Sequence, residues 1–143
     1  MTKARLIYLL DNNILSEPTK ANANPLVLNK LKQFGTHICT ASVVIHEMRF
    51  GVERLPDGKR KVALANYLNR LLVQPIVVLP YDNEAAIYHA DERVRQAALG
   101  YNTPYADGQI AAIAAVNGLT LVTRNMADFK YFKQLQLENW FET

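Results

Sequence analysis

Short apolar segments alternate with longer amphipathic segments along this chain, and this alternation constrains the fold more than any other feature. The short segments lack polar alternation, which predicts strands covered on both faces. The longer segments repeat apolar residues every three to four positions, as helices do. Strands are expected at residues 6–10, 37–41, 76–79 and 119–123, and helices at 24–34, 42–51, 62–72, 84–99 and 106–117. The pattern is typical of an α/β fold with a short parallel sheet of four to five strands between helix layers.

Capping residues mark where several of the expected helices begin and end. Side chains that accept hydrogen bonds from a first helical turn, and residues that favour a helix end, stand at the right places. N-caps are expected at Asn24, Ser42 and Asp82, and helix ends at Gly51, Pro75, Gly100 and Gly118. A short final element is expected around residues 138–141.

Length and composition favour one globular domain over residues 1–143. The chain has 143 residues, of which 50% are hydrophobic, so a core can form. The single cysteine, Cys39, excludes an internal disulfide and is expected to be a small buried side chain. The longest apolar run, residues 110–116, is too short for a membrane span. We therefore expect a cytoplasmic protein without membrane association.

Four carboxylates fall where the ends of the predicted strands would gather. Asp11 follows the first strand and Asp128 lies in the loop after the fourth. Glu47 lies in the helix after the second strand, and Asp107 in the first turn of the helix before the fourth. Because ligands of parallel α/β folds bind outside the carboxyl ends of the strands, these side chains are predicted to converge.

A convergence of carboxylates indicates a divalent cation. Carboxylate oxygens suit Mg²⁺ or Mn²⁺, and without a cation such groups repel and raise one another's pKa. The net charge of +3 becomes more positive once these four groups are neutralised. A basic body around an acidic pocket suits a phosphate-bearing polymer.

Three of the four carboxylates also have a plainer interpretation. Asp11 could be a turn residue, Asp107 a favourable charge at a helix N-terminus, and Asp128 the cap of a segment beginning at Phe129. Glu47 is harder to explain in this way, because it lies in the largely apolar stretch 41–48, where an unpaired charge is costly to bury.

Four segments in order carry a family resemblance. Residues 9–15 (LLDNNIL), 41–51 (ASVVIHEMRFG), 104–112 (PYADGQIAA) and 119–129 (LTLVTRNMADF) resemble the four motifs of PIN-domain ribonucleases. The nearest resemblance is to the VapC-like toxins of type II toxin–antitoxin pairs. Each motif is weak alone, but the ordered set is specific and spans nearly the whole chain.

The resemblance implies a PIN-like three-layer fold and an Mg²⁺- or Mn²⁺-dependent endoribonuclease, with transfer RNA as a frequent substrate. It also implies a VapB-like antitoxin partner and a homodimer. By motif, Asp11, Glu47 and Asp107 match the core catalytic and metal-binding acids, and Asp128 matches a more variable fourth. Some relatives carry the acid where Asn125 stands, so Asn125 is an alternative supporting residue.

Residues beside the motifs complete the predicted site. Asn12 departs from the usual Thr or Ser, but its amide can also donate and accept hydrogen bonds. Arg49, Arg124 and Lys130 adjoin motif residues and are predicted to hold phosphates, with solvated surface charge as the alternative. His46 adjoins Glu47 but points about 100° away on a helix, which favours a structural or interface role.

Two further groups have two interpretations each. Aromatic side chains could stack on bases or belong to the core or to a dimer contact: Tyr101, Tyr105, Tyr131, Phe132 and Trp140. The helical stretches 60–72 and 24–34 carry apolar residues that could form a groove for an antitoxin segment or simply pack in the core.

Two other functions compete with the ribonuclease. A catalytically quiet nucleic-acid-binding regulator, acting with a partner protein, could use the same fold. A small-molecule phosphatase is disfavoured, because position 13 is Asn and the first strand is therefore not followed by Asp-x-Asp.

Overall fold

A parallel sheet forms the centre of the computed structural model, which describes residues 5–74 and 76–142. Its five strands have the order β3-β2-β1-β4-β5, and every neighbouring pair is parallel. The strands are β1 (Tyr8–Leu10), β2 (Ile38–Ala41), β3 (Val77–Leu79), β4 (Thr120–Val122) and β5 (Gln136–Glu138). In the register, Leu9 lies opposite Cys39 and Leu121. The predicted parallel α/β sheet is confirmed, with the fifth strand slightly before the expected final element.

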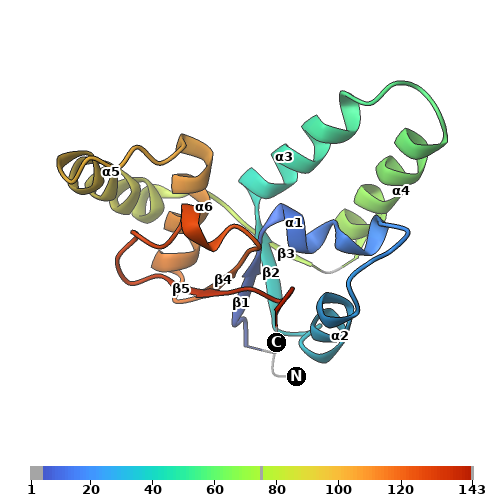
Figure 1. The fold of residues 1–143 in the computed structure, drawn as a ribbon, viewed down its shortest axis with the longest axis horizontal. Coiled ribbons are helices and arrows are strands. Elements are labelled where there is room, and N and C mark those ends of the chain that lie inside the picture. The colour runs from blue at the N-terminus through green and yellow to red at the C-terminus, as the bar shows by residue number, and fades with distance from the viewer. Residues whose placement is uncertain (1–4, 75, 143) are drawn as a thin grey trace.

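Helices cover both faces of this sheet. They are α1 (Asn12–Leu15), α2 (Pro25–Gln33), α3 (Ser42–Glu53), α4 (Lys59–Val73), α5 (Asn83–Ala98) and α6 (Tyr105–Val116), with short 3₁₀ turns η1 (Glu17–Thr19) and η2 (Met126–Asp128). Figure 1 shows α5 and α6 on one side of the sheet and α1 to α4 on the other. The chain moves outward from β1 to β3 and then returns to β4, so right-handed crossovers place the helices before β3 on one face of the sheet and those after β3 on the other.

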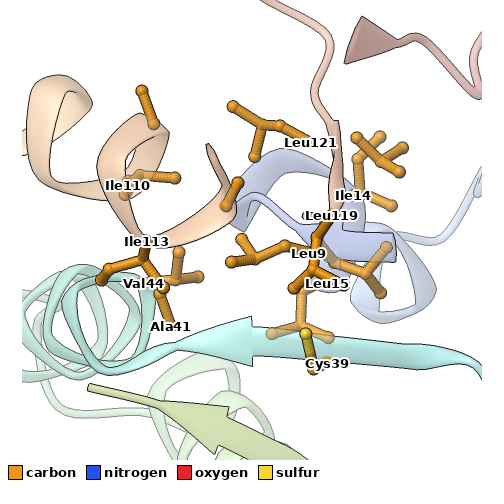
Figure 2. Close-up of a cluster of buried hydrophobic side chains, with 14 of the residues drawn as sticks. Leu9, Ile14, Leu15, Cys39, Ala41, Val44, Ile110, Ile113, Leu119 and Leu121 are labelled. Atoms are coloured by element: carbon orange, nitrogen blue, oxygen red, sulfur yellow. The ribbon is translucent and has the colours of Figure 1, made fainter. Parts of the chain in front are cut away.

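The core lies between the sheet and its helices (Figure 2). Leu9 and Leu121 of the central strands are fully buried, as are Val44 of α3 and Ile110 and Ile113 of α6. Helix α6 is apolar on nearly every side, which is why it packs in the interior. In the described part of the chain, none of the helices has the length and apolar character needed to cross a membrane.

Local signals located several helix ends correctly. Asn24 Oδ1 accepts a hydrogen bond from the Leu26 amide at 2.8 Å, and Asp82 Oδ1 accepts one from the Ala85 amide at 3.0 Å. Gly100 follows α5 with a φ of 84°. This left-handed conformation favours glycine, so the expected end of α5 is confirmed.

Three local predictions were wrong. Ser42 is the first helical residue of α3 rather than its N-cap, which is Ala41. Gly51 does not end α3, because the cost of a helical glycine is only about 1 kcal/mol and tertiary packing overrides it. Strand β3 is not buried: it is the sheet edge, and Val77 and Val78 are 41% and 37% exposed. Pro75, expected to end the helix before it, lies outside the described residues.

Candidate functional site

Asp11 is held at the carboxyl end of β1 by two hydrogen bonds. Its Oδ1 accepts from the Asn12 amide at 2.7 Å and so caps α1, a helix that the sequence pattern did not reveal. Its Oδ2 accepts from the Thr123 hydroxyl at 2.8 Å. Asp11 is only 7% exposed, and burial raises the pKa of its carboxyl, while the two hydrogen bonds partly offset that rise. Asp11 therefore does have a local structural role at the turn after β1. That role does not explain why its carboxylate is buried.

Thr123 is a site residue that sequence reasoning missed. It is fully buried at the end of β4, donates to Asp11 and accepts a hydrogen bond from the Asn125 amide at 3.1 Å. A second contact joins the same loops, since Asn13 Oδ1 accepts from the Arg124 amide at 3.1 Å. The sequence feature that could have indicated Thr123 is a hydroxyl side chain at the end of an apolar strand, inside the fourth motif.

The other three carboxylates come from α3, α6 and η2 and act on one another. Burial raises the pKa of Glu47, and the negative charges of Asp11 and Asp107 raise it further. Burial raises the pKa of Asp107 to about 6, with added repulsion from Asp11 and Asp128. Asp128 also raises the pKa of Asp11. The structure thus brings the four predicted carboxylates into one region at the carboxyl edge of the sheet.

Asp128 does not act as a helix cap. It is the last residue of η2, and its backbone amide donates to the Asn125 carbonyl at 3.1 Å. Within residues 5–74 and 76–142, its side chain makes no hydrogen bond that would cap the segment beginning at Phe129. The capping interpretation was therefore wrong.

The carboxylates are of the right chemical type to bind a divalent cation, but their side chains do not surround a single point. Across the two described ranges, no group of three or more His, Cys, Asp or Glu side chains is close enough to hold one ion. Repulsion among the carboxylates favours side-chain conformations that keep their oxygens apart. Burial is the largest cause of the raised pKa values of Glu47 and Asp107, and repulsion from the neighbouring carboxylates, which a cation would relieve, adds to it. Hard oxygen donors on several elements are the ligand set that Mg²⁺ or Mn²⁺ prefers.

The predicted supporting and phosphate-binding residues have varied surroundings. Asn12 and Glu47 line the same hollow of about 200 Å³ between α1, α3 and α4. Arg49 is exposed and pairs with Glu53 on its own helix, at 3.1 Å from Nε to Oε1. The Arg124 guanidinium lies 4.3 Å from the ring centre of Phe141.

Lys130 and His46 each lie against an aromatic ring. The Lys130 ammonium is 5.0 Å from the ring centre of Tyr131. His46 is exposed on α3, and its ring stacks on Phe50 with centres 6.2 Å apart. Nothing in these contacts engages His46 with the carboxylates, in keeping with the expected structural or interface role.

The aromatic candidates divide into two sets. Phe132 and Trp140 are buried in the core, with 6% and 1% of their surface exposed. Tyr101, Tyr105 and Tyr131 are exposed, and the rings of Tyr101 and Tyr131 stack with centres 3.7 Å apart. Base stacking remains open to these three tyrosines only.

Of the two helices expected to form a groove, α4 borders a hollow and α2 does not border it. A hollow of about 480 Å³ lies between η1 and α4, and its lining combines apolar and basic side chains: Pro18, Thr19, Lys59, Arg60, Ala63, Leu64, Tyr67 and Arg70. No residue of α2 lines this described hollow. Exposed Leu26 and Leu28 of α2 therefore belong to another part of the surface.

Comparison with known proteins gives consistent results along most of the chain. The chain is 33% identical over 130 residues to Toxin FitB of Neisseria gonorrhoeae, with 86% of this chain and 91% of that protein covered. It is 31% identical over 127 residues to VapC ribonuclease Y4jK of Sinorhizobium fredii, covering 87% and 91%. It is 27% identical over 136 residues to the tRNA(fMet)-specific endonuclease VapC of Salmonella typhimurium, covering 94% and 98%.

A solved structure and a family profile agree with these relatives. The structure of FitAB bound to an IR36 DNA fragment matches with a TM-score of 0.87 and 28% identity, covering 96% of this chain and 97% of that one. The profile of the PIN domain matches residues 8–133, a segment that includes all four carboxylates. The chain therefore belongs to the PIN-domain family, and its fold is that of the toxins in VapBC-type toxin–antitoxin complexes.

Proposed function

We propose that this protein is a divalent-metal-dependent endoribonuclease and the toxin of a type II toxin–antitoxin pair. The observation that carries the proposal is the convergence of four carboxylates: the charges of Asp11 and Asp107 act on Glu47, and the charge of Asp128 acts on Asp11 and Asp107. A PIN-domain chain gathers these acids from four separate elements at the edge of the sheet where ligands bind. The names of its relatives support RNA as the substrate, and transfer RNA is the class we expect.

The four acids have distinct proposed roles. Asp11 and Asp107 are the primary ligands of Mg²⁺ or Mn²⁺, and Asp128 completes the site. When bound, the cation supplies a Lewis acid that lowers the pKa of water and offsets charge at the phosphate. Glu47, half-buried among like charges, orients the attacking water or binds the cation through it. Thr123 keeps Asp11 in one orientation through the hydroxyl hydrogen bond.

Neighbouring polar residues would position the RNA. Asn12 shares the hollow beside Glu47 and is proposed to orient groups there in place of the usual hydroxyl. Asn125 is the proposed substitute for Asp128 as a supporting ligand. Arg49, Arg124 and Lys130 are proposed to hold phosphates, because guanidinium and ammonium groups offer the donors that phosphate oxygens accept.

An antitoxin segment is the proposed occupant of the hollow between η1 and α4. The basic groups Lys59, Arg60 and Arg70 lie beside the apolar Leu64 and the ring of Tyr67. This lining suits an acidic segment with apolar anchors, which is a common mode of peptide recognition. A VapB-like protein and a second copy of this chain are the partners we expect.

A quiet DNA-associated regulator is the second candidate, because the solved relative FitAB is bound to DNA. The two candidate functions differ in whether they require the four carboxylates. A regulator that acts through its partner would keep its function when Asp107 is replaced by Asn, whereas a nuclease would not.

RNA cleavage by purified protein tests the proposal. Wild type and Asp107→Asn are incubated with total cellular RNA in Mn²⁺ or Mg²⁺, and the products are mapped by sequencing. We expect discrete cuts by the wild type, a loss of at least about 100-fold in the variant, and no cleavage with chelator. Equal cleavage by both proteins, or cleavage that persists in chelator, would refute the mechanism.

A further inference from the structure

A third hollow adjoins the acidic site but is lined by none of its carboxylates. It has a volume of about 390 Å³ and lies among α5, the following loop and the first turn of α6. Its lining comprises His89, Ala90, Arg93, Val94, Gln96, Ala97, Tyr101, Asn102, Thr103, Gly108 and Phe132, and we name it the α5 pocket. Gly108 directly follows Asp107, so the pocket and the acidic site share the first turn of α6. The volume is within the range of small-ligand sites.

The walls of the α5 pocket suit a flat aromatic group. Ala90 and Ala97 are small, exposed side chains on α5, and they leave the entrance open. Tyr101 is 37% exposed, and its ring is held by stacking on Tyr131 at an interplanar angle of 13°. A tyrosine ring fixed beside small apolar walls is a surface on which a nucleobase can stack.

Gln96 gives the pocket a hydrogen-bond donor without a partner. Gln96 is 2% exposed, and its Oε1 accepts from the Thr103 hydroxyl at 2.6 Å. Its Nε2 is buried and has no hydrogen-bond partner in the described chain. Buried amide groups are rarely left unpaired, so the polar part of the pocket wall is incompletely satisfied here.

Arg93 gives the pocket a positive charge that is not neutralised. Its guanidinium lies 5.2 Å from the ring centre of Tyr105, which is a contact that leaves its outer N–H groups free. Among the described residues, no carboxylate pairs with Arg93, whereas Arg95 on the same helix pairs with Glu92 at 2.7 Å. An unpaired guanidinium beside an aromatic wall matches the phosphate of a nucleotide.

We propose that the α5 pocket binds one unstacked nucleotide of the RNA beside the scissile phosphate, with its base against Tyr101 and its phosphate on Arg93. This inference rests on the proposed ribonuclease function. Stacking on Tyr101 and an ion pair with Arg93 are open to nucleotides of all four bases. The pocket therefore recognises an unstacked nucleotide whatever its base.

Cleavage of short single-stranded RNAs tests whether the pocket holds a base. Each RNA carries one of the four bases, or no base, at one position flanking the cleaved bond. Wild type is expected to cleave RNAs with a base at one such position about tenfold faster than the RNA with no base there, in line with the typical contribution of one stacked base.

A matched pair of variants on α5 separates pocket filling from a general change in the helix. Ala97→Leu fills the pocket with an exposed leucine, and Ala98→Leu adds the same side chain next to it, outside the lining. We expect Ala97→Leu to abolish the base preference while the RNA without a base is still cleaved, and Ala98→Leu to behave as wild type. A preference unchanged in Ala97→Leu, or a wild-type rate that does not depend on the presence of a base, would overturn the proposal.

A binding measurement without catalysis distinguishes failure of the pocket from failure of the ribonuclease. The protein in chelator is titrated with uridine or adenosine monophosphate, and the side-chain amide signals of Gln96 are followed by NMR, with assignment from Gln96→Glu. Each nucleotide should shift these signals, and Ala97→Leu should abolish the shift. A shift without RNA cleavage would refute the ribonuclease and support the pocket, and cleavage without a shift or a base preference would refute the pocket. If Ala97→Leu changes only the oligomeric state in sedimentation, the pocket is a contact between copies and the proposal is wrong.

Discussion

A single hydroxyl holds the buried carboxylate Asp11 at the candidate site. Thr123→Val keeps the side-chain shape but removes the donor to Asp11 Oδ2. Because hydrogen bonds to charged groups contribute about 1.5–3 kcal/mol, we expect a similar loss in the free energy of unfolding. RNA cleavage should fall at least tenfold, since Asp11 would lose its fixed orientation. Thr123→Ser keeps the hydroxyl and should stay near wild type in denaturation and in cleavage rate; equal losses in both variants would contradict this role.

Asp107 makes the stability of the metal-free protein depend on pH. Its pKa is raised from the usual 3.8 to about 6, so the folded state binds the proton more tightly than the unfolded state. The contribution to stability is therefore complete below about pH 4 and is lost as the pH rises to about 6, by roughly 1–3 kcal/mol. Chemical denaturation in chelator from pH 4 to 7 measures this fall. Asp107→Asn should flatten it, and an undiminished fall in the variant would assign the effect to other groups.

At the scale of elements, the close approach of α5 and α6 depends on Gly108. A Cβ at this position would lie 2.7 Å from Cδ2 of His89, whose ring is held by the Tyr81 hydroxyl at 2.8 Å. Gly108→Ala should lower the free energy of unfolding by about 1–3 kcal/mol, because overpacking outweighs the helix-propensity gain of about 1 kcal/mol.

Gly51→Ala is the matched control for that prediction. Gly51 is also inside a helix, but an added Cβ would meet no described atom within 4 Å. We expect this variant to gain up to about 1 kcal/mol in thermal or chemical denaturation. If both alanine variants changed stability alike, packing against His89 would not explain the glycine at position 108.

Element boundaries were predictable where a local side chain decides them. Asn24 and Asp82 cap their helices because their oxygens lie within reach of the next amides, which depends on a few consecutive residues. Strand β3 was misjudged because an apolar run has the same pattern whether the strand is central or at the edge. Its place in the sheet depends on pairing with β2, which local patterns do not encode.

For the whole molecule, the topology of the sheet accounts for the predictable part of the site. Asp11, Glu47 and Asp107 could be placed because parallel strands direct their carboxyl ends to one edge, and the ordered motifs agreed with this placement. Thr123 and Gln96 could not be placed, since their importance depends on one hydrogen-bond partner, or its absence, in the folded chain. Sequence patterns indicate which residues lie near the carboxyl edge of the sheet. They do not indicate which polar atoms find a hydrogen-bond partner in the folded chain.

Binding of Mn²⁺, measured by calorimetry, tests most directly whether the four carboxylates converge on a divalent cation. The wild type should bind Mn²⁺, and Asp11→Asn, Glu47→Gln and Asp107→Asn should each weaken binding at least tenfold, with Asp128→Asn having a smaller effect. Asp91→Asn removes an exposed carboxylate of α5 outside the site and should bind as the wild type does. Mn²⁺ affinity that is absent in the wild type, or unchanged in Asp107→Asn, would contradict the metal-dependent site.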